Sequence, residues 1–214
     1  MSGGIYERLL GAGTGDVFAG VAVGIVTNVK DPDSLGRVRL RLPWLADDVE
    51  SDWARVATPM AGNGTGAQFQ PRVDDEALVA FEHGDPGTPY VIGWLWNGRD
   101  APPQPDTSGR GDVQVLRSRS GHVVRLDDTK DGERVEIIAK GARSSIVIDV
   151  VGRTVTVTGE SDVVIEAAAG RLTLHGKAGV EITSDSTVKV DGKAGTEVTG
   201  GPRLTLKGAV VNIN

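Results

Sequence analysis

The chain has 214 residues, a length that fits one large domain or two small ones. It contains no cysteine, which excludes disulfides and cysteine-ligated metal sites, and no apolar run approaches the ~18 residues that a membrane helix needs. The net charge is -6, and residues 1–100 account for it with 8 basic and 14 acidic side chains. A nucleic-acid partner is not expected, because such proteins usually carry a basic patch or stripe.

The aromatic residues divide the chain into two parts. All 4 Trp, 2 Tyr and 3 Phe precede residue 100, and none follows Trp96. Large aromatic side chains usually anchor the core of a monomeric domain. The two parts are therefore predicted to pack by different rules.

Residues 20–99 have the pattern of a small β-barrel. Strands are expected at 21–29, 37–42, 53–59, 76–83 and 90–96, and residues 37–42 alternate strictly between charged and apolar side chains. A turn is expected at 31–36, where Pro32 fixes φ and Gly36 is free to adopt a positive φ. Residues 61–66 and 84–87 are expected to be loops. About five strands in ~80 residues, without helical periodicity, fit an OB-type Greek-key barrel.

Three stretches of this segment carry a family resemblance: GIVTNVKDPDSLGRVRLRLPWL from Gly24, WARVATPMAGNGTG from Trp53 and EALVAFEHGDPGTPYVIGWLWNG from Glu76. In this order they resemble the OB domain of the contractile-tail spike family. That family includes phage baseplate assembly protein V and the valine-glycine repeat spike proteins of type VI secretion. The resemblance covers about residues 24–98 and implies a spike subunit. Asp74 stands where relatives often have glycine, so the conformation of that one turn is open.

Residues 100–112 are predicted to be a linker, because they contain three prolines among small polar residues. Strands are expected next at 114–118, 123–126 and 135–139, and a hairpin loop at 127–132 joins the last two. In the resembling family, SRSGHVVRLDDTKDGERVEII from Ser118 resembles the stretch that leads into a needle. The predicted organisation is a 1–19 N-terminal extension, a 20–99 barrel, a 100–112 linker and a 113–214 spike.

An internal repeat begins near residue 147. Units such as VTVTG at Val155, LTLHG at Leu172, VKVDG at Val188 and LTLKG at Leu204 follow a step of eight residues, with a single step of nine at 167–170. Apolar residues alternate with Thr, Glu, Lys or His in each unit, as in a strand with one buried face. The glycine that follows permits a bend. Each unit therefore supplies one strand and one corner.

The repeat predicts an intertwined trimeric β-helix. A single chain with three-sided coils would need about three units per turn, so its units would form fewer than three coils with almost no aliphatic interior. Three chains would share one narrow core, which suits Val, Leu, Ile and Thr. The predicted fold class is all-β, an N-terminal OB-type barrel followed by this trimeric needle. The expected trimer core consists of Val155, Val157, Val163, Ile165, Leu172, Leu174, Val180, Ile182, Val188, Val190, Val198, Leu204 and Leu206.

No residue pattern indicates catalysis or a bound cofactor or metal ion. His83, His122 and His175 are not spaced with other ligands as in a metal site. The 127–132 loop partly resembles a calcium loop but lacks its final Glu. Ser118 lies near His122 without the glycines of a nucleophile elbow. A non-enzymatic protein is predicted.

Two other classes of function stay open on the sequence alone. An OB-fold nucleic-acid-binding protein with an oligomerisation tail would need a basic groove with stacking aromatic residues. A trimeric β-helix polysaccharide-degrading tail protein would need paired carboxylates, whereas Glu166, Asp191 and Glu197 occur singly on the outward register. The leading hypothesis is a structural central spike that pierces a target envelope when a contractile sheath contracts.

The resemblance also implies partners. Type VI relatives have a hub domain fused before the barrel, so with ~20 residues there this chain is expected to bind a separate hub protein. The tip residues Val211, Asn212, Ile213 and Asn214 are expected to bind a small conical cap that resembles the proline-alanine-alanine-arginine (PAAR) repeat proteins. Transient contact with the target membrane is expected too. The first residues lack the pattern of a secretory signal, so assembly is expected in the cytoplasm, into the baseplate of a virion or phage-tail-like particle.

Overall fold

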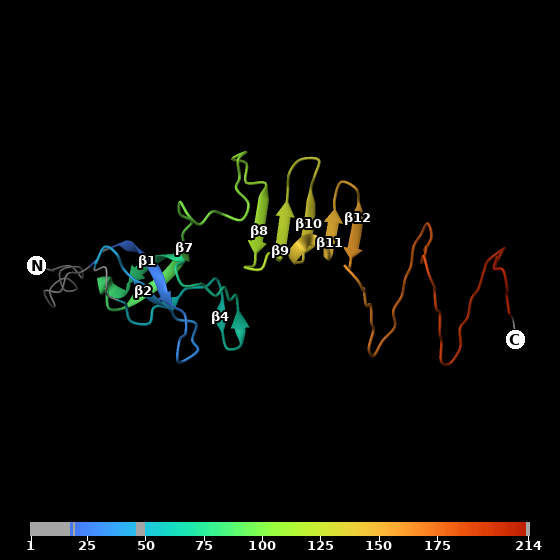
Figure 1. Cartoon of the computed structure of the whole chain (residues 1–214), viewed down its shortest axis with the longest axis horizontal. Coiled ribbons are helices and arrows are strands. Elements are labelled where there is room, and N and C mark those ends of the chain that lie inside the picture. Colours follow the sequence, from blue (N-terminus) through green and yellow to red (C-terminus); the bar gives the residue numbers. More distant parts are fainter. Residues whose placement is uncertain (1–17, 19, 46–49, 213–214) are drawn as a thin grey trace, which may run out of the picture. The chain divides into compact units, whose positions relative to one another are not determined.

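We describe the protein from a computed structural model, in which residues 18, 20–45 and 50–212 are described (Figure 1). The regular elements within these residues are β-strands and two short 3-10 helices. The chain divides into two compact units, with the boundary between Glu160 and Ser161. The first unit holds the paired strands, and the second consists of extended stretches joined by bends.

The N-terminal part of the first unit is a curled five-stranded sheet in the order β2-β1-β6-β7-β3, antiparallel except for the β3–β7 pair. Val38 and Ala54 form a bridge in which each backbone N–H donates to the other's carbonyl, at 3.0 and 2.8 Å. Val38 precedes β2 and Ala54 precedes β3, so this bridge joins the two edges of the sheet. The strands are β1 (Val21–Asn28), β2 (Arg39–Arg41), β3 (Arg55–Val56), β6 (Glu76–Phe81) and β7 (Pro89–Trp94). A strand thus lies at each of the five predicted places, although β2 and β3 are much shorter than the predicted 37–42 and 53–59.

Alternate apolar side chains fill the inside of this sheet. On β6, Ala77, Val79 and Phe81 are buried and the residues between them are partly exposed. Val26 from β1 and Leu40 from β2 are fully buried against them. The barrel therefore has a hydrophobic core within one chain. Burial of this apolar surface stabilises the fold by about 25 cal/mol per Å².

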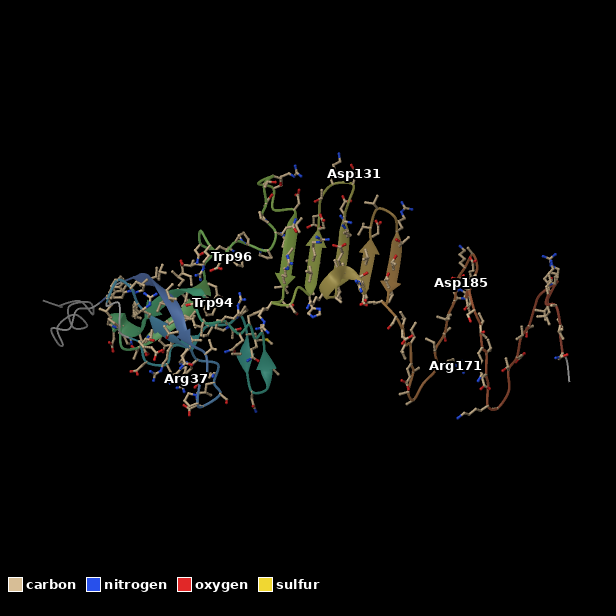
Figure 2. The ribbon with its side chains drawn as sticks, viewed as in Figure 1. Arg37, Trp94, Trp96, Asp131, Arg171 and Asp185 are labelled. Atoms are coloured by element: carbon tan, nitrogen blue, oxygen red, sulfur yellow. The ribbon has the colours of Figure 1, made fainter. Side chains whose placement is uncertain are left out.

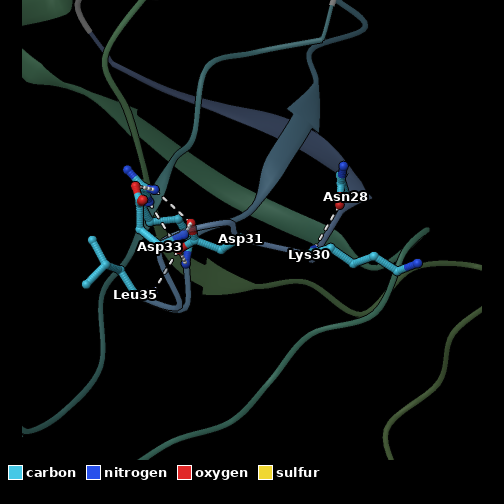
Figure 3. A network of polar contacts seen from close by, with 6 residues as sticks. Asn28, Lys30, Asp31, Asp33 and Leu35 are labelled. Atoms are coloured by element: carbon cyan, nitrogen blue, oxygen red, sulfur yellow. Dashed lines mark hydrogen bonds and ion pairs between the residues drawn. The ribbon is translucent and has the colours of Figure 1, made fainter.

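Asp31 holds the turn between β1 and β2 (Figure 3). Its carboxylate accepts the backbone N–H groups of Asp33, Leu35 and Arg37 at 3.1, 2.9 and 3.1 Å. The guanidinium of Arg37 also donates to it at 2.7 Å. This contact with Arg37 is the main reason why the pKa of Asp31 lies well below its usual range. Gly36 has a φ of +73°, as the predicted turn requires.

Asp74 adopts the conformation that glycine would adopt. Its φ is +75°, in the left-handed region that Asp and Asn tolerate better than most residues. Its backbone N–H donates to the carbonyl of Val26 at 2.8 Å, so the turn before β6 still bonds to β1. The turn therefore has the left-handed backbone conformation that glycine usually provides, with Asp74 in the glycine position.

Two local predictions need correction. The strand expected at 76–83 ends at Phe81, because a 3-10 helix (η1, Glu82–Gly84) follows in which His83 has a φ of 52°. The loop expected at 61–66 contains a small hairpin of β4 (Ala61–Gly62) and β5 (Thr65–Gly66). Two-residue, glycine-rich strands show no apolar alternation, so the pattern does not reveal them.

The predicted linker contains a compact turn around Asp106. The carboxylate of Asp106 accepts the backbone N–H groups of Ser108, Gly109 and Gly111 at 2.9, 3.0 and 2.6 Å. Hydrogen bonds, first that of the Ser108 side chain, lower the pKa of Asp106. An aspartate that bonds to backbone two or more residues further on is typical of such turns. This part of the chain is therefore more ordered than its proline content indicates.

A second five-stranded sheet follows as an antiparallel meander from β8 to β12. The strands β8, β9 and β10 and the loop between the last two confirm the predictions. β11 is not among the predicted strands, because it begins at Ser145, before the repeat that starts near residue 147. The 3-10 helix η2 (Lys140–Ala142) joins β10 to β11. The strands are β8 (Val113–Arg117), β9 (Val123–Asp127), β10 (Arg134–Ile138), β11 (Ser145–Asp149) and β12 (Thr154–Thr158).

The second unit runs back and forth in extended stretches (Figure 1). Bends occur at 177–178, 185–186, 193–194, 201–202 and 209. They recur every eight residues, as the repeat predicts. No strand is formed in the described part of this unit, because a strand needs a hydrogen-bonded partner and these stretches have none in the single chain. The trimeric β-helix stays a prediction at this point.

Candidate assembly surface

One face of the second sheet is apolar and exposed. The register of its antiparallel pairs places Leu116 opposite Val124, Val124 opposite Ile137, Ile137 opposite Ile146 and Ile146 opposite Val157. An apolar row therefore crosses all five strands, and a second row lies beside it. We call the two rows together the apolar face: Leu116, Val124, Leu126, Val135, Ile137, Ile146, Ile148, Val155 and Val157, each exposed in the single chain.

The opposite face carries charged side chains that pair with each other. Arg125 forms a salt bridge with Glu136, which lies directly across on β10 and has a side chain only 7% exposed. Asp127 lies across from Arg134, with 3.7 Å between carboxylate and guanidinium. Hydrogen bonds from Thr129, together with the nearby Arg charges, lower the pKa of Asp127. These pairs share their face with Val115, Val123, Ile138 and Val147, which are only partly exposed. The apolar face differs in that it carries no charged side chain and its members are all exposed, which is typical of an interaction surface.

The predicted trimer core is divided between the two units. Val155 and Val157 lie on the apolar face, where they pair with Ile148 and Ile146. The other eleven members alternate along the extended stretches of the second unit and are exposed: Val163, Ile165, Leu172, Leu174, Val180, Ile182, Val188, Val190, Val198, Leu204 and Leu206. The single chain does not bring them together.

Seven residues of the apolar face were missing from the predicted core. They are Leu116, Val124, Leu126, Val135, Ile137, Ile146 and Ile148. The available signal was the same alternation of apolar and other residues in 123–127 and 134–138. This alternation predicts strands but does not show that their apolar sides form one surface.

The second unit has no core in the single chain. Every described residue after Glu160 is exposed, apart from the partly exposed Gly200. Figure 2 shows side chains such as those of Arg171 and Asp185 on a single layer of chain. Fixing the backbone of one residue costs about 1–2 kcal/mol of conformational entropy, and no buried apolar surface offsets that cost here. Burial within the single chain therefore does not account for this conformation.

Two of the bends share the motif GKAG, at 176–179 and 192–195. A Cβ on Gly176 would lie 2.0 Å from the carbonyl oxygen of Gly179, and a Cβ on Gly192 would lie 2.3 Å from that of Gly195. Both distances are far below van der Waals contact. The Gly195 N–H donates to the carbonyl of Gly192 at 3.1 Å and closes the second corner. Only glycine fits the first position of these corners.

Three of the residues considered for catalysis or metal binding take part in turns and surface pairs. The Nδ1 atom of His122 accepts the backbone N–H of Lys140 at 3.1 Å, and the Ser118 hydroxyl accepts the backbone N–H of His122 at 3.0 Å. Asp191 pairs with Lys189 at 3.5 Å. Within 18, 20–45 and 50–212, no three His, Asp or Glu side chains are grouped closely enough to hold a metal ion.

Val211 and Asn212 of the predicted cap-binding tip are exposed, whereas Ile213 and Asn214 lie outside the described residues.

In the described part of the chain, no helix has both the length and the apolar character to cross a bilayer.

The barrel matches a known family. The model of the type VI secretion system/phage-baseplate injector OB domain matches residues 22–96. This span contains β2, β3, β6 and β7 and nearly all of β1. The match therefore coincides with the curled sheet and its core.

The chain is also similar to type VI secretion system spike proteins. It is 36% identical to VgrG4b of Pseudomonas aeruginosa over 117 residues, which are 50% of this chain and 14% of that protein. It is 27% identical to VgrG1a of the same organism over 126 residues, 54% of this chain and 20% of the relative. With VgrG3 of Vibrio cholerae it shares 35% identity over 75 residues, 33% of this chain and 7% of the relative. The chain thus covers no more than 20% of the length of these three relatives. Residues 22–96 therefore form an OB domain of the type VI secretion and phage-baseplate injector family, and the chain is similar to type VI spike proteins.

Proposed function

We propose that this chain is the structural, non-enzymatic central spike of a contractile injection apparatus, either a phage tail or a phage-tail-like particle. Three copies would build one needle from residues 113–214, in which the β8–β12 sheets pack together and the stretches of the second units wind into a β-helix. The observation that best supports this is the second unit, whose residues 161–212 bury no side chain although apolar residues alternate along its stretches. Three-fold winding would cover these residues and the apolar face together.

The proposed mechanism is mechanical. Backbone hydrogen bonds between strands of different copies would run along the needle, and the aliphatic side chains would form a dry core. Hydrogen-bonded strands lie about 4.8 Å apart. If each eight-residue unit advances the needle by one such spacing, residues 147–214 form a rod of roughly 40 Å. Such a rod could pierce an envelope when a sheath contracts. The barrel would seat the rod.

The proposed partners sit at the two ends. A separate hub protein would hold the barrel end, and a small PAAR-like cap would bind Val211, Asn212, Ile213 and Asn214 of the three copies. An unpaired strand end exposes backbone N–H and C=O groups, and such edges are normally covered by another chain. Contact with the target membrane would be transient, and the particle would assemble in the cytoplasm.

Light scattering on the purified full chain tests the assembly. We expect a single species of three times the 22.4 kDa chain mass that resists heating. A monodisperse monomer would contradict the proposal. A dimer would contradict it as well, because two extended stretches cannot enclose a three-sided core.

A further inference from the structure

The barrel carries a second uncharged surface, which the proposed needle does not use. We call it the barrel groove: an open hollow of about 840 Å³ lined mainly by residues 56–71, with Leu35, Ile92 and Trp94. Met60 and Phe69 are exposed there by 58% and 61%. None of the lining residues is charged, although charged residues make up 24% of the chain. Depletion of charge is typical of the centre of protein–protein interfaces.

Phe69 connects the barrel groove to the apolar face. Besides the groove, it lines a second hollow of about 710 Å³ together with Trp96 and Pro103. The other side of that hollow is the apolar face, represented by Leu116, Val124, Ile137, Ile146 and Val157. Trp96, labelled in Figure 2, is 65% exposed. The apolar surface is therefore continuous from the sheet to the barrel.

The loop that forms the groove is held by its own hydrogen bonds. The Ala57 N–H donates to the carbonyl of Val91 on β7 at 2.8 Å, and the Ala67 N–H donates to the carbonyl of Met60 at 3.1 Å. The Thr58 hydroxyl donates to the carbonyl of Ala67. A loop backbone that is already ordered adds little to the conformational entropy lost on binding.

We propose that the barrel groove receives a second copy of this chain, so that the assembly interface extends from the needle onto the barrel. The inference rests on the proposed trimer and adds a second contact region to it. A copy that covers the apolar face must cover the hollow at Phe69 and Trp96, and the groove begins on the other side of Phe69. In a closed three-fold ring each copy offers its groove to the next, a head-to-tail contact. The absence of charge in the groove favours a protein surface over a polyanion.

A photo-crosslinking experiment on the full chain tests this contact. Phe69→p-benzoylphenylalanine keeps an aromatic side chain, and Met60→p-benzoylphenylalanine provides a second position in the same groove. Lys30→p-benzoylphenylalanine is the matched control, since Lys30 is exposed on the barrel and lines neither hollow. Each variant is purified alone, sized by light scattering, irradiated and separated on a denaturing gel. We expect a crosslinked product of two chains from positions 69 and 60 and at least tenfold less from position 30.

The outcomes separate the two proposals. A trimer without crosslinks from either groove position overturns the groove contact and leaves the proposed needle standing. A trimer that crosslinks equally from all three positions also overturns it, because the contact is then unspecific. A wild-type monomer overturns the needle and the groove contact together. If both groove variants lose the trimer while the control keeps it, and their tryptophan fluorescence shows a folded barrel, the groove contact is supported.

Discussion

The guanidinium of Arg37 donates to both carboxylate oxygens of Asp31, with Nε and Nη2 at 3.1 and 2.7 Å, and the Asp31 side chain is only 3% exposed. The same carboxylate accepts three backbone N–H groups of the turn between β1 and β2. One side chain thus binds three backbone N–H groups and a guanidinium at this turn. The barrel should therefore depend on the charge of Asp31.

We expect Asp31→Asn to lower the stability of the barrel at pH 7. The pKa of Asp31 is lower in the folded chain than its unfolded value of about 3.9. Its contribution is therefore complete above about pH 4 and is lost as the pH falls toward the folded pKa. The stability difference between wild type and variant should shrink between about pH 4 and pH 2. Urea unfolding followed by tryptophan fluorescence measures this, because all four Trp lie in the barrel.

The exposed Asp52→Asn is the control for that experiment. It should change the free energy of unfolding by no more than about 0.5 kcal/mol at any pH in this range. If Asp31→Asn and Asp52→Asn behave alike, the Asp31 network does not stabilise the barrel.

Asp74 allows a test of backbone conformation. Its φ of +75° suits glycine and is costly for a β-branched residue. We expect Asp74→Gly to keep the barrel within about 1 kcal/mol of wild type, and Asp74→Val to lose about 1–2 kcal/mol more. Urea midpoints of the two variants decide it. Equal midpoints would mean that the turn relaxes to a conformation that valine accepts.

The two registers of the repeat should respond differently to charge. We expect Val157→Asp and Leu206→Asp to prevent trimer formation, since an unpaired charge in a shared dry core costs several kcal/mol and three copies approach each other. Thr156→Asp and Thr205→Asp, one residue earlier on the other register, should keep the trimer. Light scattering compares the four variants. The same result in both registers would show that the faces are assigned wrongly.

Gly176, in a GKAG corner, and Gly201, in a later bend, provide a matched pair of glycines. Gly176→Ala places a Cβ 2.0 Å from the carbonyl oxygen of Gly179, whereas a Cβ on Gly201 meets no atom within 4 Å. We expect Gly176→Ala to lower the melting temperature of the trimer by several degrees, and Gly201→Ala to leave it within about 2 °C. Thermal melts followed by circular dichroism measure both. If Gly201→Ala is the more harmful change, the corner geometry is not what limits the needle.

The tip can be tested by truncation. A chain that ends at Gly208 lacks Val211, Asn212, Ile213 and Asn214 and should still form the trimer, because Leu204 and Leu206 remain. We expect it to lose a PAAR-like cap protein that the full chain retains in a pull-down. Retention of the cap by the truncated chain would place the docking surface elsewhere.

The barrel could be predicted strand by strand because its alternation is satisfied within one chain. Residues 37–42 alternate between arginine and an apolar residue, and Val38 and Leu40 are indeed fully buried. The β4–β5 hairpin could not be predicted this way, because its four residues include two glycines and bury nothing. The turn around Asp106 has a local sequence pattern, Asp followed two and three residues later by Ser and Gly. The prolines nearby favour a flexible linker instead, so the pattern alone does not predict the turn.

The assembly surface could be predicted in part. The eight-residue step gave the positions of Val155, Val157 and their successors, and the bends from 177 onward recur at that step. Ile146 and Ile148 share the surface with them but lie in a hairpin that pairs within the chain. A strand pattern shows which side chains share a face and does not show what covers it. The barrel groove has no periodic pattern at all and becomes visible only when Leu35, Phe69 and Trp94 meet in the fold.

The eight-residue bends have a consequence for the order of folding in the proposed trimer. A stretch of the second unit finds no hydrogen-bonded neighbour in its own chain, so chain connectivity does not speed its folding and the rate should depend on chain concentration. The hairpins of β8 to β12 pair locally and can form first, as short loops close quickly. Three such sheets would act as a clasp that aligns the copies before the first stretch winds. A copy misaligned by one repeat would leave the tip uneven by one strand spacing, about 4.8 Å.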